Sequence, residues 1–197
     1  MATLDDVALS AWLSELSQLS QRQQLWTPSI STELYAIAQA RAANFDIAST
    51  CIKLALTDTS SALFATAIDA AISQQESLRA ACCEMVLNRY PLEELNLALT
   101  DGRELVRLSA INSLNSRGVT AASIIEAALS DESIDVLHAA LHSLGELRVA
   151  SSLPAVNAFV GAEYDDTTRS IALKTIGAIG DVSSLQLLSE TSRDFSA

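Results

Sequence analysis

The fold is decided by a ten-residue motif that occurs three times, as Val106-Arg-Leu-Ser-Ala-Ile-Asn-Ser-Leu-Asn115, Val136-Leu-His-Ala-Ala-Leu-His-Ser-Leu-Gly145 and Thr168-Arg-Ser-Ile-Ala-Leu-Lys-Thr-Ile-Gly177. The copies begin 30 and 32 residues apart. Each has Ala at the fifth place, Ile or Leu at the sixth and an aliphatic residue at the ninth. Because an α-helix has about 3.6 residues per turn, places 1, 5 and 9 share one face. The motif therefore predicts three amphipathic helices, each ended by its closing Asn or Gly in a left-handed conformation.

The residues on either side of the motif complete a repeating unit. A carboxylate stands five residues ahead of each copy, at Asp101, Asp131 and Glu163, where it can cap helix N–H groups and favour the helix dipole. After each copy comes a second helical segment, and the first turn of one of them contains Pro154. The predicted unit is thus helix, short turn, helix. The second helices are expected over 121–129, 152–159 and 183–188.

Upstream, the repeat becomes less regular. Residues 78–86 resemble a fourth copy of the first helix, with 91–99 as its partner. Residues 3–20 form an amphipathic pattern, and 21–28 read as a connector. Further helices are expected over 31–43, 46–57 and 61–73, without an assigned register. We predict one continuous domain, in which residues 1–43 are an N-terminal cap or divergent repeat and 44–197 are the array. Its clearest copies are 101–130, 131–162 and 163–190.

Composition limits the function. The chain has 197 residues, with 24 acidic and 12 basic side chains and a formal net charge of −12. This charge repels phosphates, so we expect no nucleic-acid partner and no docking on anionic membranes. No apolar run approaches the length of a membrane helix, and the N-terminus lacks the pattern of a signal peptide. We therefore predict a cytoplasmic protein without membrane insertion.

The repeat resembles HEAT-like repeats, in particular the short, regular type found in phycobilisome lyase proteins. The resemblance rests on Asp, Val-Arg, a central Ala, Leu-Gly and a Ser-Leu-Pro-Ala-like second helix, and it is best over residues 101–190. It implies an all-α fold, a right-handed α-solenoid of HEAT-like helical repeats. Relatives with this repeat include paired E/F-type bilin lyases, which attach a linear tetrapyrrole to a cysteine of a phycobiliprotein. Other relatives act as chaperones or adaptors without chemistry.

One enzymatic relative can be excluded on the residues. Deoxyhypusine hydroxylases share this repeat but carry His-Glu pairs that hold two irons. The corresponding pairs here are His138-Ala139 and Ser170-Ile171. Both pairs lack the glutamate, and the second also lacks the histidine, so we do not expect this activity.

A polar stripe on the second copy is a candidate metal site. Asp131, Asp135, His138, His142 and Glu146 are spaced i, i+4, i+7, i+11 and i+15, within one stripe of a helix. Histidines four residues apart with nearby carboxylates can bind a divalent metal such as zinc. The simpler interpretation is the side of an amphipathic helix that faces solvent or a partner.

The cysteines offer a second candidate site. Cys51, Cys82 and Cys83 are odd in number and lack the spacing of a zinc motif, so they do not indicate a disulfide framework. Cys82-Cys83 could be a thiol handle for a tetrapyrrole or a metal. However, Cys82 aligns with the central Ala of the motif, and Cys83 with the aliphatic residue after it, so core packing is the favoured interpretation.

The leading functional prediction is a non-catalytic scaffold or adaptor that binds another protein. Its partner is expected on a concave surface formed by the second helices, with Glu126, Asn157 and Glu190 among the contacting residues. The alternative, implied by the resemblance, is a bilin lyase subunit or a chaperone for chromophore attachment. The partner would then be a phycobiliprotein or a second HEAT-like subunit. No resident cofactor is expected, although a linear tetrapyrrole is the ligand or substrate of the alternative, and enzymatic activity is left open.

Overall fold

The computed structural model describes residues 5–20 and 26–180. Within these ranges every regular element is an α-helix or a short 3₁₀ turn, and no strand occurs. The chain divides into two compact units, Met1–Glu94 and Leu95–Ala197, here called unit 1 and unit 2. Helix α6 (Leu92–Ala98) crosses the boundary between them. The domain boundary predicted after residue 43 falls inside unit 1, between its second and third helices.

Unit 1 contains five of the helices expected upstream of the regular repeat, and the sixth, expected over 91–99, is α6 at its boundary. The five are α1 (Asp6–Ser20), α2 (Pro28–Ala40), α3 (Phe45–Ala55), α4 (Phe64–Ile72, preceded by the 3₁₀ turn η1, Ser61–Leu63) and α5 (Glu76–Leu87). The helices predicted over 31–43, 46–57 and 61–73 are therefore confirmed. Helix α2 begins earlier than expected, because Pro28 occupies its first turn, where a missing N–H costs nothing. Pro28, which was predicted to end the connector, therefore belongs to α2, and residues 21–25 of the predicted connector lie outside the described residues.

Buried polar side chains join the helices of unit 1. Ser31 on α2 accepts a hydrogen bond from the Trp26 indole at 3.0 Å and donates one to the carbonyl of Ala55, at the end of α3, at 3.1 Å. Gln74 donates through Nε2 to the carbonyl of Ala38 at 3.2 Å. These bonds satisfy polar groups where helix ends meet and complement the apolar core between α2, α3 and α4.

Unit 2 is the regular repeat. Helices α7 (Glu104–Ser116), α9 (Ile134–Glu146) and α11 (Asp166–Ile179) contain the three copies of the motif. The second helices α8 (Ala122–Ala127) and α10 (Leu153–Asn157) are short, and each lies between two 3₁₀ turns. The turns are η2 (Val119–Ala121) and η3 (Ala128–Ser130) around α8, and η4 (Ala150–Ser152) and η5 (Ala158–Val160) around α10. The second helix predicted over 183–188 lies outside the described residues.

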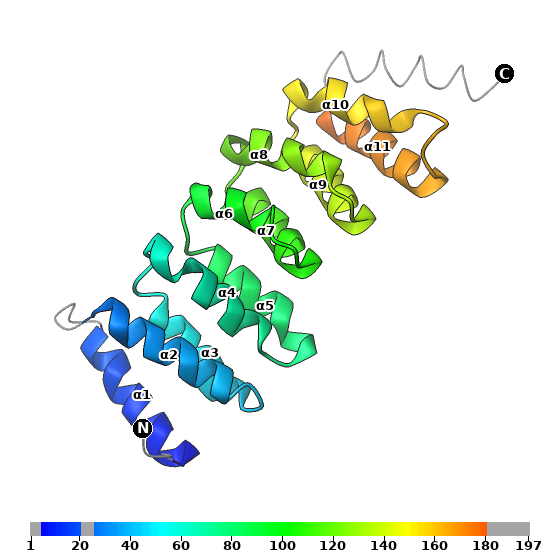
Figure 1. Ribbon diagram of the computed structural model, residues 1–197. Helices are drawn as coiled ribbons and strands as arrows, with labels where there is room; N and C mark the ends of the chain where they lie inside the picture. The colour runs from blue at the N-terminus through cyan, green and yellow to red at the C-terminus, as the bar shows by residue number, and fades with distance from the viewer. Residues whose placement is uncertain (1–4, 21–25, 181–197) are drawn as a thin grey trace. The chain divides into compact units, whose positions relative to one another are not determined.

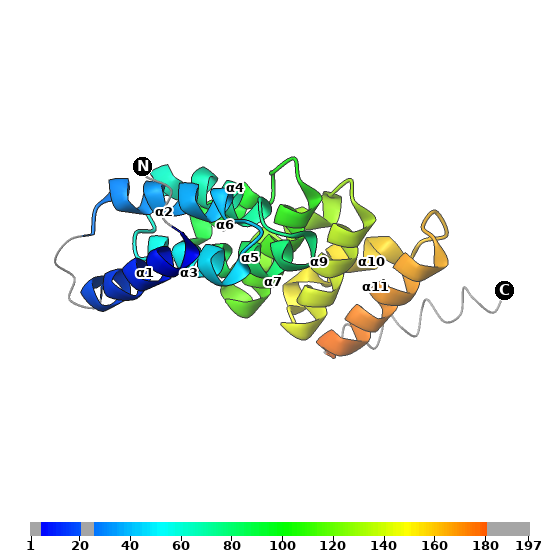
Figure 2. The same ribbon diagram turned by 90° about the horizontal axis from the view of Figure 1, so that it is seen from below.

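The three motif helices are stacked side by side. Helix α9 packs against α7 on one side and α11 on the other, while α8 contacts both α7 and α9 and α10 packs against α11 (Figure 1; Figure 2 gives a second view). The predicted core positions lie in these contacts, since the central alanines Ala110, Ala140 and Ala172 are completely buried. Small side chains at the centre allow the helix axes to approach closely, and the aliphatic residues around them supply the buried area.

The predicted helix ends are wrong by three residues. Asn115, Gly145 and Gly177 lie inside their helices, and in the described part of unit 2 the residues with positive φ are Gly118 (φ 79°), Arg148 (φ 52°) and Gly180 (φ 69°). After α9 the chain closes with a hydrogen bond from the Val149 N–H to the Leu144 carbonyl, the closure typical of a left-handed helix end. Each helix therefore continues one or two residues beyond the closing Asn or Gly of the motif, and the residue with positive φ lies three positions after it.

Gly145 has a packing role instead of a terminating one. A Cβ atom at this position would lie 3.3 Å from the Cα of Thr175 on α11. The glycine thus lets α9 and α11 approach each other along their backbones. The Thr175 hydroxyl donates to the Leu141 carbonyl at 3.0 Å across the same contact.

None of the three predicted carboxylates caps its helix. Asp101 and Asp131 accept backbone N–H groups at 2.9 and 2.8 Å, but these belong to Arg103 and Ser133, the N-cap residues that precede α7 and α9. In the third repeat Asp165, and not Glu163, accepts from the Thr167 N–H at 2.9 Å and caps α11. Glu163 is exposed, because the turn before α11 contains extra residues that displace the capping carboxylate along the sequence.

Candidate partner-binding surface

The two described residues predicted to contact a partner lie on α8 and α10. Glu126 is half-buried, and its Oε1 atom accepts a hydrogen bond from the hydroxyl of Ser152, which directly precedes α10 in the next repeat. Asn157 stands at the matching place of α10, and its Oδ1 atom is buried, without a hydrogen-bond partner in the described part of the chain. Glu190, the third predicted residue, lies outside the described residues. Glu126 thus joins two repeats, a role that the sequence did not indicate.

The outward surface of the second helices is small and nearly uncharged. Its exposed residues include Ser123 and Ala127 on α8, and Pro154 and Ala158 on and after α10. Glu126 is the single titratable residue of these two helices. A surface of small side chains costs little entropy and little desolvation to cover, so it suits contact with another protein.

The polar stripe of the second copy does not converge on one point. His138 Nε2 lies 2.8 Å from the Thr168 hydroxyl on α11, whereas Glu146 accepts from the Asn115 side chain on α7 at 2.6 Å. These two residues therefore face opposite neighbours of α9. Asp135 and His142 are exposed. Among the described residues no group of three His, Cys, Asp or Glu side chains could hold a metal ion.

Asp131 belongs to a buried ion pair and not to the stripe. Arg107 on α7 donates to both carboxylate oxygens of Asp131, at 2.8 and 3.0 Å, and also to the Asp101 carbonyl at 2.9 Å. The side chains of Arg107 and Asp131 are 7% and 8% exposed. A bidentate pair with so little exposure fixes the register between successive repeats, because either partner alone would be a buried charge.

The next interface uses a different link. Asp165 accepts the Thr168 hydroxyl proton at 2.6 Å, so the Thr168 oxygen must accept the hydrogen of His138 Nε2. The bond from the Thr168 hydroxyl, together with the backbone N–H groups of Thr168 and Thr167, holds the pKa of the Asp165 carboxyl below its usual value. Between α9 and α11, hydrogen bonds that link His138, Thr168 and Asp165 therefore take the place that the ion pair of Arg107 and Asp131 has between α7 and α9.

The cysteines lie in the core. Cys51, Cys82 and Cys83 are all completely buried. Burial raises the pKa of Cys51 to about 12 and also raises that of Cys82. A buried thiol with a raised pKa is a poor nucleophile, so Cys82 and Cys83 do not form an accessible handle in this structure.

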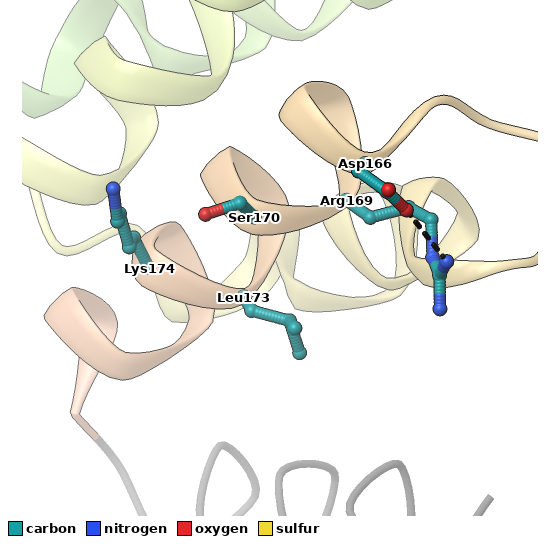
Figure 3. Close-up of a pocket in the computed structure, with 5 residues that line it drawn as sticks. All are labelled: Asp166, Arg169, Ser170, Leu173 and Lys174. Atoms are coloured by element: carbon teal, nitrogen blue, oxygen red, sulfur yellow. Dashed lines mark hydrogen bonds and ion pairs between the residues drawn. The ribbon is translucent and has the colours of Figure 1, made fainter. Parts of the chain in front are cut away.

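A shallow pocket of about 410 Å³ lies on the outer side of α11. Figure 3 shows Arg169 turned toward Asp166, with an ion-pair distance of 3.2 Å, and Lys174 pointing away from that pair. Leu173, which is half-buried, supplies the apolar part of the lining. All of its lining among the described residues comes from this one helix, so the pocket shows no convergent set of polar groups.

Sequence reasoning missed the turn between α10 and α11. Asp131 follows η3 directly, whereas residues 161–164 separate η5 from Asp165. Phe159 and Tyr164 at the two ends of this turn pack together, with ring centroids 4.9 Å apart and planes tilted by 46°. The signal available in the sequence was the repeat offset, which is 30 residues between Asp101 and Asp131 but 34 between Asp131 and Asp165.

Comparison with known proteins supports the repeat assignment. A family model described as HEAT repeats matches residues 121–196. No curated protein matches the chain. No described helix is long and apolar enough to cross a membrane. With an all-helical fold in the described ranges, stacked motif helices in unit 2 and this match, the fold is an all-α solenoid of helical repeats, and residues 121–196 are similar to HEAT repeats.

Proposed function

We propose that this protein is a non-catalytic scaffold that binds a partner protein on the outward surface of α8 and α10. The observation that carries the proposal is that the exposed side chains of this surface are small and almost without charge. The carboxylate of Glu126 is engaged by Ser152, and the exposed positions are small and uncharged, so a partner can cover them at little cost. HEAT repeats commonly mediate contacts between proteins, which agrees with a scaffold role.

The test uses substitutions that leave the internal links intact. Ala127 and Ala158 are exposed, so Ala127→Arg and Ala158→Arg add bulk and charge to the surface without removing a core contact. Glu126 is a poor probe, because its substitution also breaks the bond from Ser152. The matched control is His142→Arg, an exposed position on α9.

The measurement is the affinity for a partner identified by crosslinking in the native cell and then purified. We expect Ala127→Arg and Ala158→Arg each to weaken binding by about ten-fold or more, as substitutions at the centre of an interface do. His142→Arg should leave the affinity unchanged. If His142→Arg alone weakens binding, the partner uses the α9 side and the proposal is wrong.

The second proposal, a bilin lyase subunit or chaperone for a phycobiliprotein, rests on the sequence resemblance. It takes a linear tetrapyrrole as ligand or substrate and a phycobiliprotein, or a second HEAT-like subunit, as partner. Co-expression with a phycobilin and an apo-phycobiliprotein should then give a covalently coloured product or a bilin-bound chain, recorded by absorption spectroscopy. A colourless complex with some other protein would favour the scaffold.

A further inference from the structure

We propose that the aromatic pair Phe159–Tyr164, together with the carboxylate of Glu163 on the same turn, binds an arginine or lysine side chain from a basic segment of the partner protein. This inference rests on the proposed function, since the pair lies directly after α10, at one end of the surface assigned to the partner. It adds the chemistry of the partner, which the small residues of α8 and α10 do not define.

The turn that carries the pair is an insertion held in a defined conformation. The Tyr164 N–H donates to the Gly161 carbonyl at 3.3 Å, and Arg169 donates through Nε to the Val160 carbonyl at 3.3 Å. A Cβ atom at Gly161 would collide with the Glu163 carboxylate, so the glycine allows that side chain to lie over the turn. Inserted turns on a rigid scaffold are where repeat proteins commonly carry binding residues.

The exposed groups of the turn favour a cation. Phe159 and Tyr164 are half-buried, so part of each ring surface is accessible, and their tilted planes leave faces to which a guanidinium or ammonium group can bind. Glu163 is exposed, and so is the Asp166 carboxylate. Among the described residues, the basic side chain bonded to this turn is Arg169, which is already engaged by Val160 and Asp166. Negative charge is therefore in excess on this turn, and a partner cation is complementary to it.

The pair distinguishes this turn from the acidic turn of the preceding repeat. The turn before α9 also has an exposed carboxylate, Glu132, but no aromatic residue lies within its sequence. A purely electrostatic attraction would also draw a cation to Glu132, which is 89% exposed and lies 3.7 Å from Arg107. Binding through the rings would select the turn before α11, so Glu132 provides the matched control.

The experiment titrates the full chain with a blocked hexa-arginine peptide and follows backbone amide shifts by NMR. We expect saturable shifts confined to residues 159–166 and no binding of the neutral hexa-citrulline peptide. Tyr164→Leu and Glu163→Gln should each weaken binding about three-fold, as expected for loss of one exposed cation–π or charge-assisted contact. Tyr164→Phe should bind like the unaltered chain, because it keeps the ring, and it also shows that the turn tolerates substitution.

Three outcomes would overturn the proposal. They are equal shifts at the turns before α9 and α11, equal weakening by Glu132→Gln and Glu163→Gln, and an unchanged affinity in Tyr164→Leu. The variant Ala127→Arg should leave peptide binding unaltered. If the unaltered chain does not bind the peptide, only the cation site is contradicted. If Ala127→Arg leaves the partner affinity unchanged, only the surface of α8 and α10 is contradicted.

Discussion

At the residue scale, Arg148 has a positive φ at the end of α9, where the neighbouring repeats have a glycine. Its φ of 52° compares with 69° at the left-handed Gly180, and non-glycine residues in this region cost about 1–2 kcal/mol. The sequence could not show this, because the motif places its glycine three residues before Arg148. Arg148 thus has a local strain that the closure of α9 imposes.

We expect Arg148→Gly to stabilise the protein by about 0.5–1 kcal/mol, since relief of the left-handed strain exceeds the added entropy of the unfolded chain. The measurement is the free energy of unfolding in urea. Arg117, the last residue before Gly118, has φ −83°, so Arg117→Gly is the control and should destabilise. A loss of stability in Arg148→Gly would show that the arginine side chain contributes more than the strain costs.

The capping carboxylate Asp165 gives a prediction about pH. Its pKa is lowered in the folded protein, first by the Thr168 hydroxyl, so the ionised form adds stability that is present above the ordinary carboxyl pKa and lost as pH falls through the folded pKa. We expect Asp165→Asn to destabilise at neutral pH and the difference from the unaltered chain to shrink between about pH 5 and pH 2. Thermal unfolding across this range checks it. The control Asp135→Asn, at an exposed position, should follow the unaltered chain, and a constant difference for Asp165→Asn would contradict the prediction.

At the element scale, the contact between α9 and α11 depends on the absence of a side chain at Gly145. Valine at this position would force its Cβ into the 3.3 Å gap to the Thr175 backbone, and overpacking of this kind costs about 1–3 kcal/mol. We therefore expect Gly145→Val to lower the midpoint of chemical unfolding. At Gly102 no heavy atom lies within 4 Å of the place that a Cβ would occupy, so Gly102→Val is the control and should change little. Equal effects of the two substitutions would remove the packing role of Gly145.

The contact between α7 and α9 depends on the ion pair of Arg107 and Asp131. Asp131→Ala leaves a buried guanidinium without its carboxylate, which costs about 3–5 kcal/mol. Leu137 stands one repeat later at the place of Arg107, so leucine is compatible with this position. We expect the double variant Arg107→Leu/Asp131→Ala to be more stable than Asp131→Ala, with a coupling of about 1 kcal/mol or more in a double-mutant cycle. Additive effects would mean that the pair does not act as a unit.

The elements also show what the sequence could predict. The 3.6-residue period identifies the core positions, and Ala110, Ala140 and Ala172 are all buried as expected. Helix ends and capping residues were displaced, because glycine can serve either a turn or a close helix contact, and a single chain does not reveal which. The aromatic turn was missed for a different reason, because an insertion breaks the regular spacing by which repeats are recognised.

At the scale of the whole molecule, charge dominates the solution behaviour. The net charge of −12 keeps molecules apart at neutral pH, and it vanishes near the isoelectric point of about 4.4. We expect light scattering to reach its maximum close to that pH, where repulsion between molecules is lost. A maximum far from this pH would show that surface patches, and not the net charge, control association.

The candidate site is less predictable at this scale than the fold. The sequence pointed to α8 and α10 through the general habit of helical repeats, but it could not show that Glu126 is bonded to Ser152. Similarly, the stripe on α9 looked like one cluster along the helix, yet His138 and Glu146 contact different neighbours. Side chains that join repeats resemble surface residues until the repeats are stacked.

The unlike links on the two sides of α9 have a consequence for how such a gene can grow. Tandem duplication of residues 101–130 would set Arg107 of one copy against the Asp101 of the next, which stands where Asp131 stands now, so the junction would still be matched. Duplication of 131–164 would instead bring His138 against Val136 in the position of Thr168 and leave the imidazole without its hydroxyl. Duplication of residues 101–130 would therefore keep the contact between repeats matched, whereas duplication of 131–164 would leave one contact without its hydrogen-bond partner.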